Sequence, residues 1–363
     1  MTKFRSLIPV ALPVIAVLVL AGVWGTTLHP VTVGVVAVVL AIAVLSAVHH
    51  AEVVAHRVGE PFGSLVLAVA VTIIEVALII TLMGSGKEGA STLARDTVFA
   101  AFMITLTGII GASLLVAGTR FRYVHFNPEG SGAALATVTA MATLTLIVPA
   151  VTTSAAESEF TSSQLAFAGI SSLLLYLAFV GTQTIRHRDF FLPVEIPGED
   201  HSDDDTHADP PSKRATLVSL LLLLIALIAV VGLAKVESPS IEAGVRAAGF
   251  PASFVGVVIA LLVLLPESIA AIRAASRNRM QISLNLAIGS AIASIGLTIP
   301  AIALASLWVD TPLVLGLSPL QIVLAALTVV MTVLTIVPGR ATRMQAVVHL
   351  AVFAAFIFLS IVP

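Results

Sequence analysis

The sequence predicts an all-α membrane protein with about 11 transmembrane helices. Two observations predict this class. The 363 residues are 58% hydrophobic and only 10% charged, and the apolar residues form continuous runs of about 18–25 positions. A β-barrel is disfavoured because its strands are about ten residues long and alternate apolar with polar positions.

Each apolar run that can cross about 30 Å of hydrocarbon is expected to form one helix. The runs lie near residues 7–25, 31–48, 62–83, 97–118, 132–153, 164–185, 215–234, 251–271, 284–306, 313–337 and 345–362.

The runs divide into an additional N-terminal helix and two sets of five. We expect the first helix in residues 1–30, one repeat in 31–185, an acidic cytoplasmic linker in 186–214 and a second repeat in 215–363. Because five is odd, the repeats enter the membrane from opposite sides. This is the inverted-repeat arrangement of secondary transporters.

Lys and Arg are distributed unequally between the two predicted faces. The face with the N-terminus and the loops after the even-numbered spans carries fourteen of the 18 basic residues. The positive-inside rule therefore predicts a multi-pass protein of the bacterial inner membrane, with a cytoplasmic N-terminus and an outside C-terminus.

Several function classes are excluded or disfavoured by composition. The chain has no cysteine, which excludes disulfides and thiol chemistry. Its net charge of −2 and scattered basic residues do not favour nucleic acid as a partner. An intramembrane hydrolase would need a nucleophile and a base on facing spans, and the sequence shows no such pair. We therefore expect a transporter without a cofactor rather than an enzyme, and the sequence leaves the oligomeric state open.

Glu75 and Glu267 are each the only acidic residue in a predicted span. A carboxylate at the bilayer centre costs roughly 2.5–3.5 kcal/mol on insertion scales, so it needs a proton, a cation or another charge beside it. Phe62 precedes Glu75 by 13 residues, and Phe254 precedes Glu267 by 13. Inverted repeats would bring the two carboxylates together at mid-depth.

Such a pair predicts cation/proton exchange. One divalent cation or two protons would neutralise both carboxylates, whereas the empty, doubly charged form is expensive to move through an apolar barrier. The protein would reorient when loaded, so that cation extrusion is driven by proton entry. A cation channel is the remote alternative.

Local motifs resemble the cation/calcium exchanger superfamily, most closely its ChaA-type bacterial calcium (sodium, potassium)/proton antiporters. The motifs are His49-His50-Ala51-Glu52, Gly59-Glu60-Pro61-Phe62, Leu265-Pro266-Glu267-Ser268 and Asn285-Leu286-Ala287-Ile288-Gly289-Ser290. The resemblance covers nearly the whole chain. It implies that Glu75 and Glu267 bind both the cation and the protons, with Ca²⁺ as the expected cation and Na⁺ or K⁺ as the alternative.

The sequence departs from the family pattern three positions before each acid. Family members often have Asn there, whereas this chain has Thr72 and Leu264. Because Ca²⁺ takes six to eight oxygen ligands, backbone carbonyls or water would have to supply the remainder.

Five residues are candidates for auxiliary ligands or for lining the cavity: Thr72, Pro266, Asn285, Ser290 and Ser294. Thr72 lies one helical turn before Glu75, and a proline frees a backbone carbonyl next to Glu267. The alternatives are hydroxyls that bond their own helix and small residues that pack helices together.

Five further residues are candidates for cytoplasmic cation or pH sensing: Asp203, Asp204, Asp205, His49 and His50. Acidic side chains in the linker could capture cations, and histidines titrate near neutral pH. The alternative is a solvated linker and a solvated helix end. The expected partners are inorganic cations, protons and the lipid bilayer.

Overall fold

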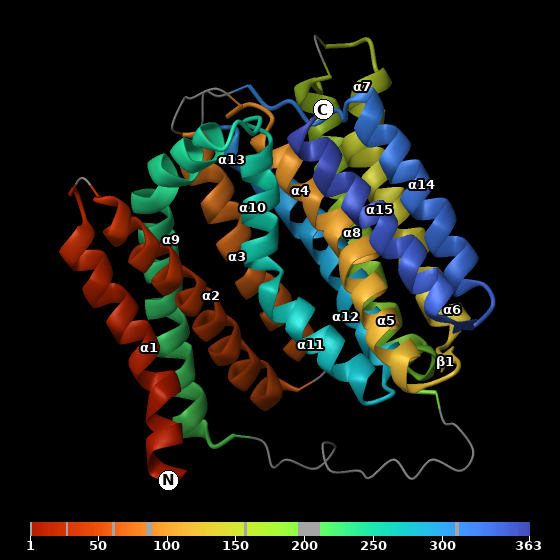
Figure 1. Ribbon diagram of the computed structural model, residues 1–363, viewed down its shortest axis with the longest axis horizontal. Helices are drawn as coiled ribbons and strands as arrows, with labels where there is room; N and C mark the ends of the chain where they lie inside the picture. Colours follow the sequence, from red (N-terminus) through yellow and green to blue (C-terminus); the bar gives the residue numbers. More distant parts are fainter. Residues whose placement is uncertain are drawn as a thin grey trace.

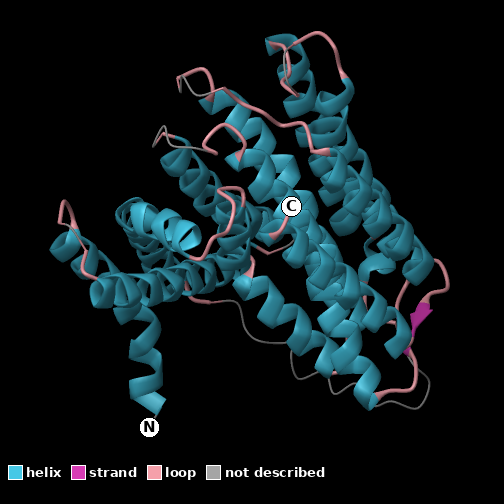
Figure 2. Ribbon diagram, turned by 45° about the horizontal axis from the view of Figure 1, so that its top comes forward, coloured by secondary structure: helices cyan, strands magenta, loops and turns pink. Residues whose placement is uncertain are grey.

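The computed structural model describes residues 2–26, 28–59, 62–84, 89–155, 158–194, 211–308 and 312–363. Within these ranges the chain forms a bundle of long helices (Figures 1 and 2). The N-terminus lies at one end of the bundle and the C-terminus at the other (Figure 1). We call these ends the N-terminal face and the C-terminal face.

The first part of the chain supplies six crossing segments. These are α1 (Thr2–Val23), α2 (Pro30–Val58), α3 (Phe62–Met83), α4 (Leu93–Met103) with η1 (Ile104–Ile109) and α5 (Ile110–Arg120), α6 (Pro128–Ala142) with η2 (Thr143–Ile147) and α7 (Val148–Val151), and α8 (Ser162–Gly181) with η3 (Thr182–Arg186). A short 3₁₀ helix, η4 (Arg188–Phe191), follows.

The second part supplies five more. These are α9 (Lys213–Ala247), α10 (Phe254–Val263) with α11 (Leu265–Ser276), α12 (Met280–Ala293) with η5 (Ser294–Thr298) and α13 (Ile299–Ala305), α14 (Pro319–Ile336) and α15 (Arg343–Ile361). At the N-terminal face, β1 (Val124–His125) pairs antiparallel with β2 (Arg340–Ala341).

The expected class, an all-α membrane protein, is confirmed. Nine helices of the described residues are long and apolar enough to cross a membrane, α10 with α11 makes a tenth, and α1 contributes the shorter apolar stretch Pro9–Val23. α2 runs toward the N-terminal face and α9 away from it, and α3 and α10 are likewise opposed (Figure 1).

Several predicted helix boundaries were wrong. The helix expected at 31–48 continues to Val58, and the one expected at 215–234 continues to Ala247. Hydropathy falls at the polar residues there, but the backbone stays helical. α2 ends at Gly59, which has a φ of +75° that glycine adopts without strain.

Proline shapes three spans. Pro149 and Pro300 each lie at the start of a helix that directly follows a π-helical turn, η2 and η5. Because proline has no N–H to donate, the turn before it loses a regular hydrogen bond and widens. Pro266 lies just past a break at which α10 and α11 are bent by 56°.

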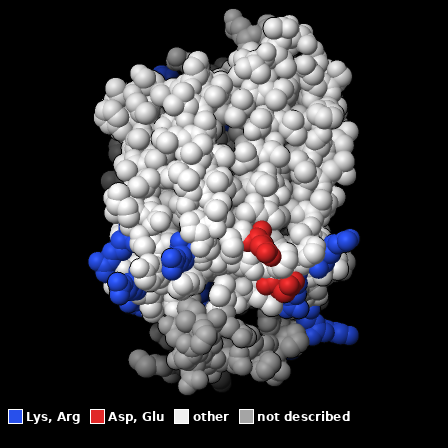
Figure 3. Space-filling model, turned by 90° about the vertical axis from the view of Figure 1, so that its right-hand side faces the viewer, with Lys and Arg blue, Asp and Glu red and all other residues white. Residues whose placement is uncertain are grey.

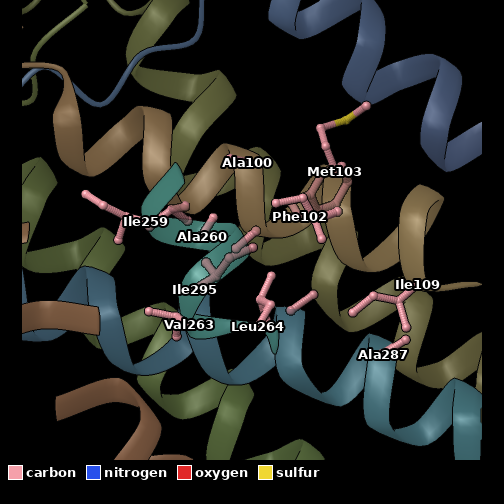
Figure 4. Close-up of a cluster of buried hydrophobic side chains, with 14 of the residues drawn as sticks. Ala100, Phe102, Met103, Ile109, Ile259, Ala260, Val263, Leu264, Ala287 and Ile295 are labelled. Carbon is pink, nitrogen blue, oxygen red and sulfur yellow. The ribbon is translucent and has the colours of Figure 1, made fainter. Parts of the chain in front are cut away.

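The centre of the bundle is a packed apolar core. Ala260 and Val263 of α10 and Leu264 at the break lie in one buried cluster with Phe102 of α4 and Ile295 of η5 (Figure 4). This core fixes the break in α10 and α11 against the helices that carry the candidate site.

Candidate cation site

Glu75 and Glu267 line the same cavity, which has a volume of about 240 Å³. Glu75 comes from α3 and Glu267 from the first turn of α11. The other polar residues of the lining are Thr72, Tyr176, Gln183, Asn285, Ser290 and Ser294. Four of the five predicted auxiliary residues therefore lie around the two acids, and Pro266 lies next to Glu267.

The Glu75 carboxylate is buried, with 4% of the residue exposed, and Ser294 holds it. The Ser294 hydroxyl donates to Glu75 Oε1 at 2.7 Å. Thr298, one turn further along, lies beside the same carboxylate, yet its buried hydroxyl makes no hydrogen bond within the described residues. The sequence argument missed Thr298, because a threonine in an apolar run reads as a hydroxyl bonded to its own helix.

The Glu267 carboxylate is held differently. It lies against its own backbone N–H, and its buried Oε2 has no hydrogen-bond partner in the described part of the chain. The bend between α10 and α11 places Glu267 at the start of a helix, and Pro266 leaves the carbonyl of Leu262 without its helical donor. An oxygen without a partner beside a broken helix is suited to bind a proton or a cation.

Two further hydroxyls face the cavity. Thr72 is 7% exposed, and within the described residues neither the Thr72 hydroxyl nor the Ser290 hydroxyl makes a hydrogen bond. By contrast, Asn285 is engaged elsewhere: its amide donates to the carbonyl of Phe191 at 2.6 Å and accepts from Gln281 at 2.9 Å. Thr72 and Ser290 are therefore freer than Asn285 to contact an ion.

The cavity extends toward the N-terminal face. Leu67 and Ala68 come from the N-terminal part of α3, Ile282 from the first turn of α12, and Gln183 from η3. All three segments end at that face (Figure 1). An ion would therefore reach the acids from the side of the N-terminus.

On the opposite side, α4 and α10 close the bundle. A Cβ on Gly256 would lie 2.8 Å from backbone atoms of both Asp96 and Thr97, so the two helices touch without space for a side chain. The buried Asp96 carboxylate accepts hydrogen bonds from Thr92 and Arg95, each at 2.9 Å, and from Gln321 of α14 at 3.3 Å. These bonds fix the start of α4 at the C-terminal face.

Glu52 of α2 is a third acid near the pair. Its charge acts on Glu267 together with that of Glu75, and it also lies near His49 and Arg273. Glu52 is exposed, whereas Glu75 is buried. The sequence predicts Glu52 at the polar end of a helix, and no pattern in the sequence predicts that Glu52 lies near α11.

The two predicted sensing histidines lie apart from the cavity lining. His49 is exposed, whereas His50 is 2% exposed and its Nε2 donates to the Pro9 carbonyl of α1 at 3.0 Å. His50 therefore links two helices and is not solvated. Asp203, Asp204 and Asp205 lie outside the described residues, so a role for them in sensing stays a prediction.

The described residues hold no cluster of three His, Cys, Asp or Glu side chains that could enclose a metal. A cation in this cavity would instead be bound by the two carboxylates, by hydroxyls and by backbone carbonyls. Such oxygen ligands suit hard cations such as Ca²⁺.

Two curated proteins match almost the whole chain. The putative ionic transporter y4hA of Sinorhizobium fredii is 44% identical over 325 residues, which is 88% of this chain and 86% of that protein. The sodium-potassium/proton antiporter ChaA of Escherichia coli is 34% identical over 349 residues, which is 95% of this chain and 93% of that protein.

The fold matches a solved exchanger. The crystal structure of the H⁺/Ca²⁺ exchanger CAX superposes with a TM-score of 0.71 at 16% identity, covering 98% of this chain and 88% of that one. The predicted resemblance to cation/calcium exchangers is confirmed, because the family described as sodium/calcium exchanger protein matches residues 28–185 and 218–362. This chain belongs to the sodium/calcium exchanger protein family.

Proposed function

We propose that this protein exchanges Ca²⁺ for H⁺ and that Glu75 and Glu267 bind the two ions in turn. The observation that carries the proposal is that these two acids, from separate parts of the chain, line one cavity. A doubly charged pair in an apolar core needs neutralisation, which one divalent cation or two protons supply. The protein crosses between its two open states in either neutral form.

The surroundings of the pair support binding of a hard cation. Ser294, Thr298, Thr72 and Ser290 add hydroxyl oxygens, and the break before Glu267 adds freed backbone carbonyls. Together with water these groups reach the six to eight oxygens that Ca²⁺ takes.

The direction of transport follows from the charge distribution. The protein lies in the bacterial inner membrane with its N-terminal face in the cytoplasm, because that face carries most of the basic residues. Residues 31–185 and 215–363 act as two inverted repeats around the site, after one additional helix in residues 1–30. The cavity then opens to the cytoplasm, and the cation leaves as protons enter.

Na⁺ or K⁺ is the second candidate for the cation. The Escherichia coli relative is named a sodium-potassium/proton antiporter, and Leu264 offers no side-chain oxygen three positions before Glu267. A monovalent cation needs only one ionised carboxylate to balance its charge, so the same site would bind it with the other glutamate protonated.

Everted membrane vesicles with an acidic interior test the proposal. Ca²⁺, Na⁺ and K⁺ are added separately, and only the transported cation should release protons from the vesicle interior. We expect this response with Ca²⁺. Glu75→Gln and Glu267→Gln should each abolish the response. Glu129→Gln, at an exposed acid in the first turn of α6, is the matched control and should respond like the wild type.

The outcomes separate the alternatives. A response to Na⁺ or K⁺ alone keeps the site and changes the ion. Exchange that persists in either glutamine variant contradicts the shared site, and the absence of exchange with all three ions contradicts the proposed function.

A further inference from the structure

A second crevice lies at the N-terminal face, apart from the cation site. It occupies about 510 Å³ between the C-terminal end of α5 and the start of α15, and it is lined by residues 118–122 and 342–344. Arg120, Arg122 and Arg343 are in this lining, all three are exposed, and no acidic residue lines the crevice. Its electrostatic character is therefore cationic.

Two of the arginines are held in place by backbone carbonyls. Arg343 donates from Nε to Gly118 and from Nη2 to Thr119, at the end of α5. Arg120 donates from Nη1 to the carbonyl of Ser276, at the end of α11, at 2.9 Å. A guanidinium carries five N–H donors, so both side chains keep donors for a further partner. The arginines are thus oriented before any ligand arrives.

The third arginine borders an aromatic residue. Arg122 and Arg340 lie over the Tyr123 ring, with guanidinium carbons 5.7 Å and 5.3 Å from its centroid. Tyr123 is 41% exposed, and tyrosine is enriched where a membrane meets water. The crevice therefore lies at the depth of lipid headgroups.

Apolar side chains continue from the crevice into the lipid-facing surface. Met344 is 67% exposed and Val347 is 53% exposed on the first turns of α15. Lys and Arg, with Asp or Glu between them, form a band near the lower end of the described surface, below a broad surface without charged side chains (Figure 3). Cationic groups beside exposed apolar groups match a ligand with an anionic head and an acyl tail.

We propose that this crevice binds the phosphate of an anionic phospholipid from the leaflet at the N-terminal face. Arg120, Arg122 and Arg343 contact the headgroup, and the acyl chains lie along Met344 and Val347. Basic pockets between helices are known to take such headgroups. A soluble phosphate would use the arginines but not the apolar surface, so the lipid is the better match.

Native mass spectrometry of the purified protein tests this site, and its readout does not depend on transport. Phosphatidylglycerol should remain bound to the protein in the mass spectrum as a stoichiometric complex, and phosphatidylethanolamine should bind far less. An excess of inorganic phosphate should not displace the phosphatidylglycerol. Arg122→Gln is the key variant, because Arg122 makes no hydrogen bond to α5 or α11 that its loss would break. We expect about a fivefold fall in phosphatidylglycerol affinity.

Two further variants complete the test. Arg122→Lys keeps the charge and should retain most of the binding. Arg214→Gln removes an exposed arginine of α9 on the same face and should bind like the wild type. Equal binding by Arg122→Gln and wild type, equal binding of the two lipids, or displacement by free phosphate would each overturn the proposal.

Discussion

The two acids of the candidate cation site have unlike neighbours. Glu75 Oε1 accepts a hydrogen bond from Ser294, whereas Glu267 Oε2 has none within the described residues. Ser294 and Thr105 are both hydroxyl residues of π-helical turns, η5 and η1. Thr105 donates to the carbonyls of Ala101 and Phe102 of its own helix, whereas Ser294 donates to a glutamate of another helix. Ser294 is therefore a specific support for one carboxylate of the pair.

Ser294→Ala should weaken cation binding without unfolding the protein. The change leaves a buried carboxylate oxygen without its donor, which costs about 1–3 kcal/mol and disfavours the ionised form that binds the cation. The half-saturating cation concentration in the vesicle assay should rise by about an order of magnitude. Ser172→Ala is the control, because within the described residues the buried Ser172 hydroxyl bonds only the Gly169 carbonyl of its own helix, α8. Equal effects of the two variants would contradict a specific role for Ser294.

Glu52→Gln should slow the entry of the cation into the cavity. An exposed negative charge near Glu267 raises the local cation concentration at the open side of the cavity. We expect a higher half-saturating concentration with little change in maximal rate. The difference from wild type should shrink at high ionic strength, because salt screens exposed charges over about 10 Å at 0.1 M. A fall in the maximal rate that does not change with ionic strength would instead show that Glu52 takes part in the transport step itself.

At the scale of elements, the α4–α10 contact closes the C-terminal side of the site. Gly256→Ala would place a methyl group against the backbone of Asp96 and Thr97. Overpacking of this kind costs about 1–3 kcal/mol, so the thermal stability of the purified protein should fall. Gly244→Ala in α9 is the matched control, because no atom lies within 4 Å of its added Cβ. An unchanged melting temperature for Gly256→Ala would show that the two helices separate easily.

Most helices could be predicted from the sequence, but their ends and breaks could not. Long apolar runs predict a helix wherever backbone groups must be satisfied in lipid. Polar residues from His49 to Arg57 end the apolar run without ending α2, because the helix packs against other protein segments there. The 56° bend at Leu264 and the π-helical turns η2 and η5 lie beside prolines, and their positions depend on packing as well, which periodicity does not reveal.

The candidate site could be predicted only in part. The two acids stand out because isolated carboxylates in apolar spans are costly. Thr72 follows from its spacing to Glu75 on one predicted helix, and Ser294 follows from its spacing to Asn285 and Ser290 on another. Thr298 lies in η5 with Ser294 and was missed because a threonine in an apolar run reads as a hydroxyl bonded to its own helix. Glu52 of α2 comes near Glu267 of α11 only in the folded bundle. Such meetings depend on tertiary packing, which a single sequence does not encode in a readable pattern.

At the scale of the whole molecule, the two faces should be distinguishable by chemical labelling. The chain contains no cysteine, so one introduced cysteine reports one position. Ser212 is exposed before α9 at the N-terminal face, and Leu307 is 72% exposed after α13 at the C-terminal face. A membrane-impermeant maleimide should label Ser212→Cys in everted vesicles and Leu307→Cys in right-side-out vesicles. The reverse result would invert the proposed orientation.

If Glu75 and Glu267 bind the ions as proposed, their unlike surroundings have a consequence for transport in the reverse direction. A carrier made of two equal halves would show the same kinetics in both directions. Here Ser294 supports one acid, and the other lies at a broken helix without such support. The forward and reverse half-cycles are therefore not mirror images, and cation uptake and cation release should saturate at different concentrations.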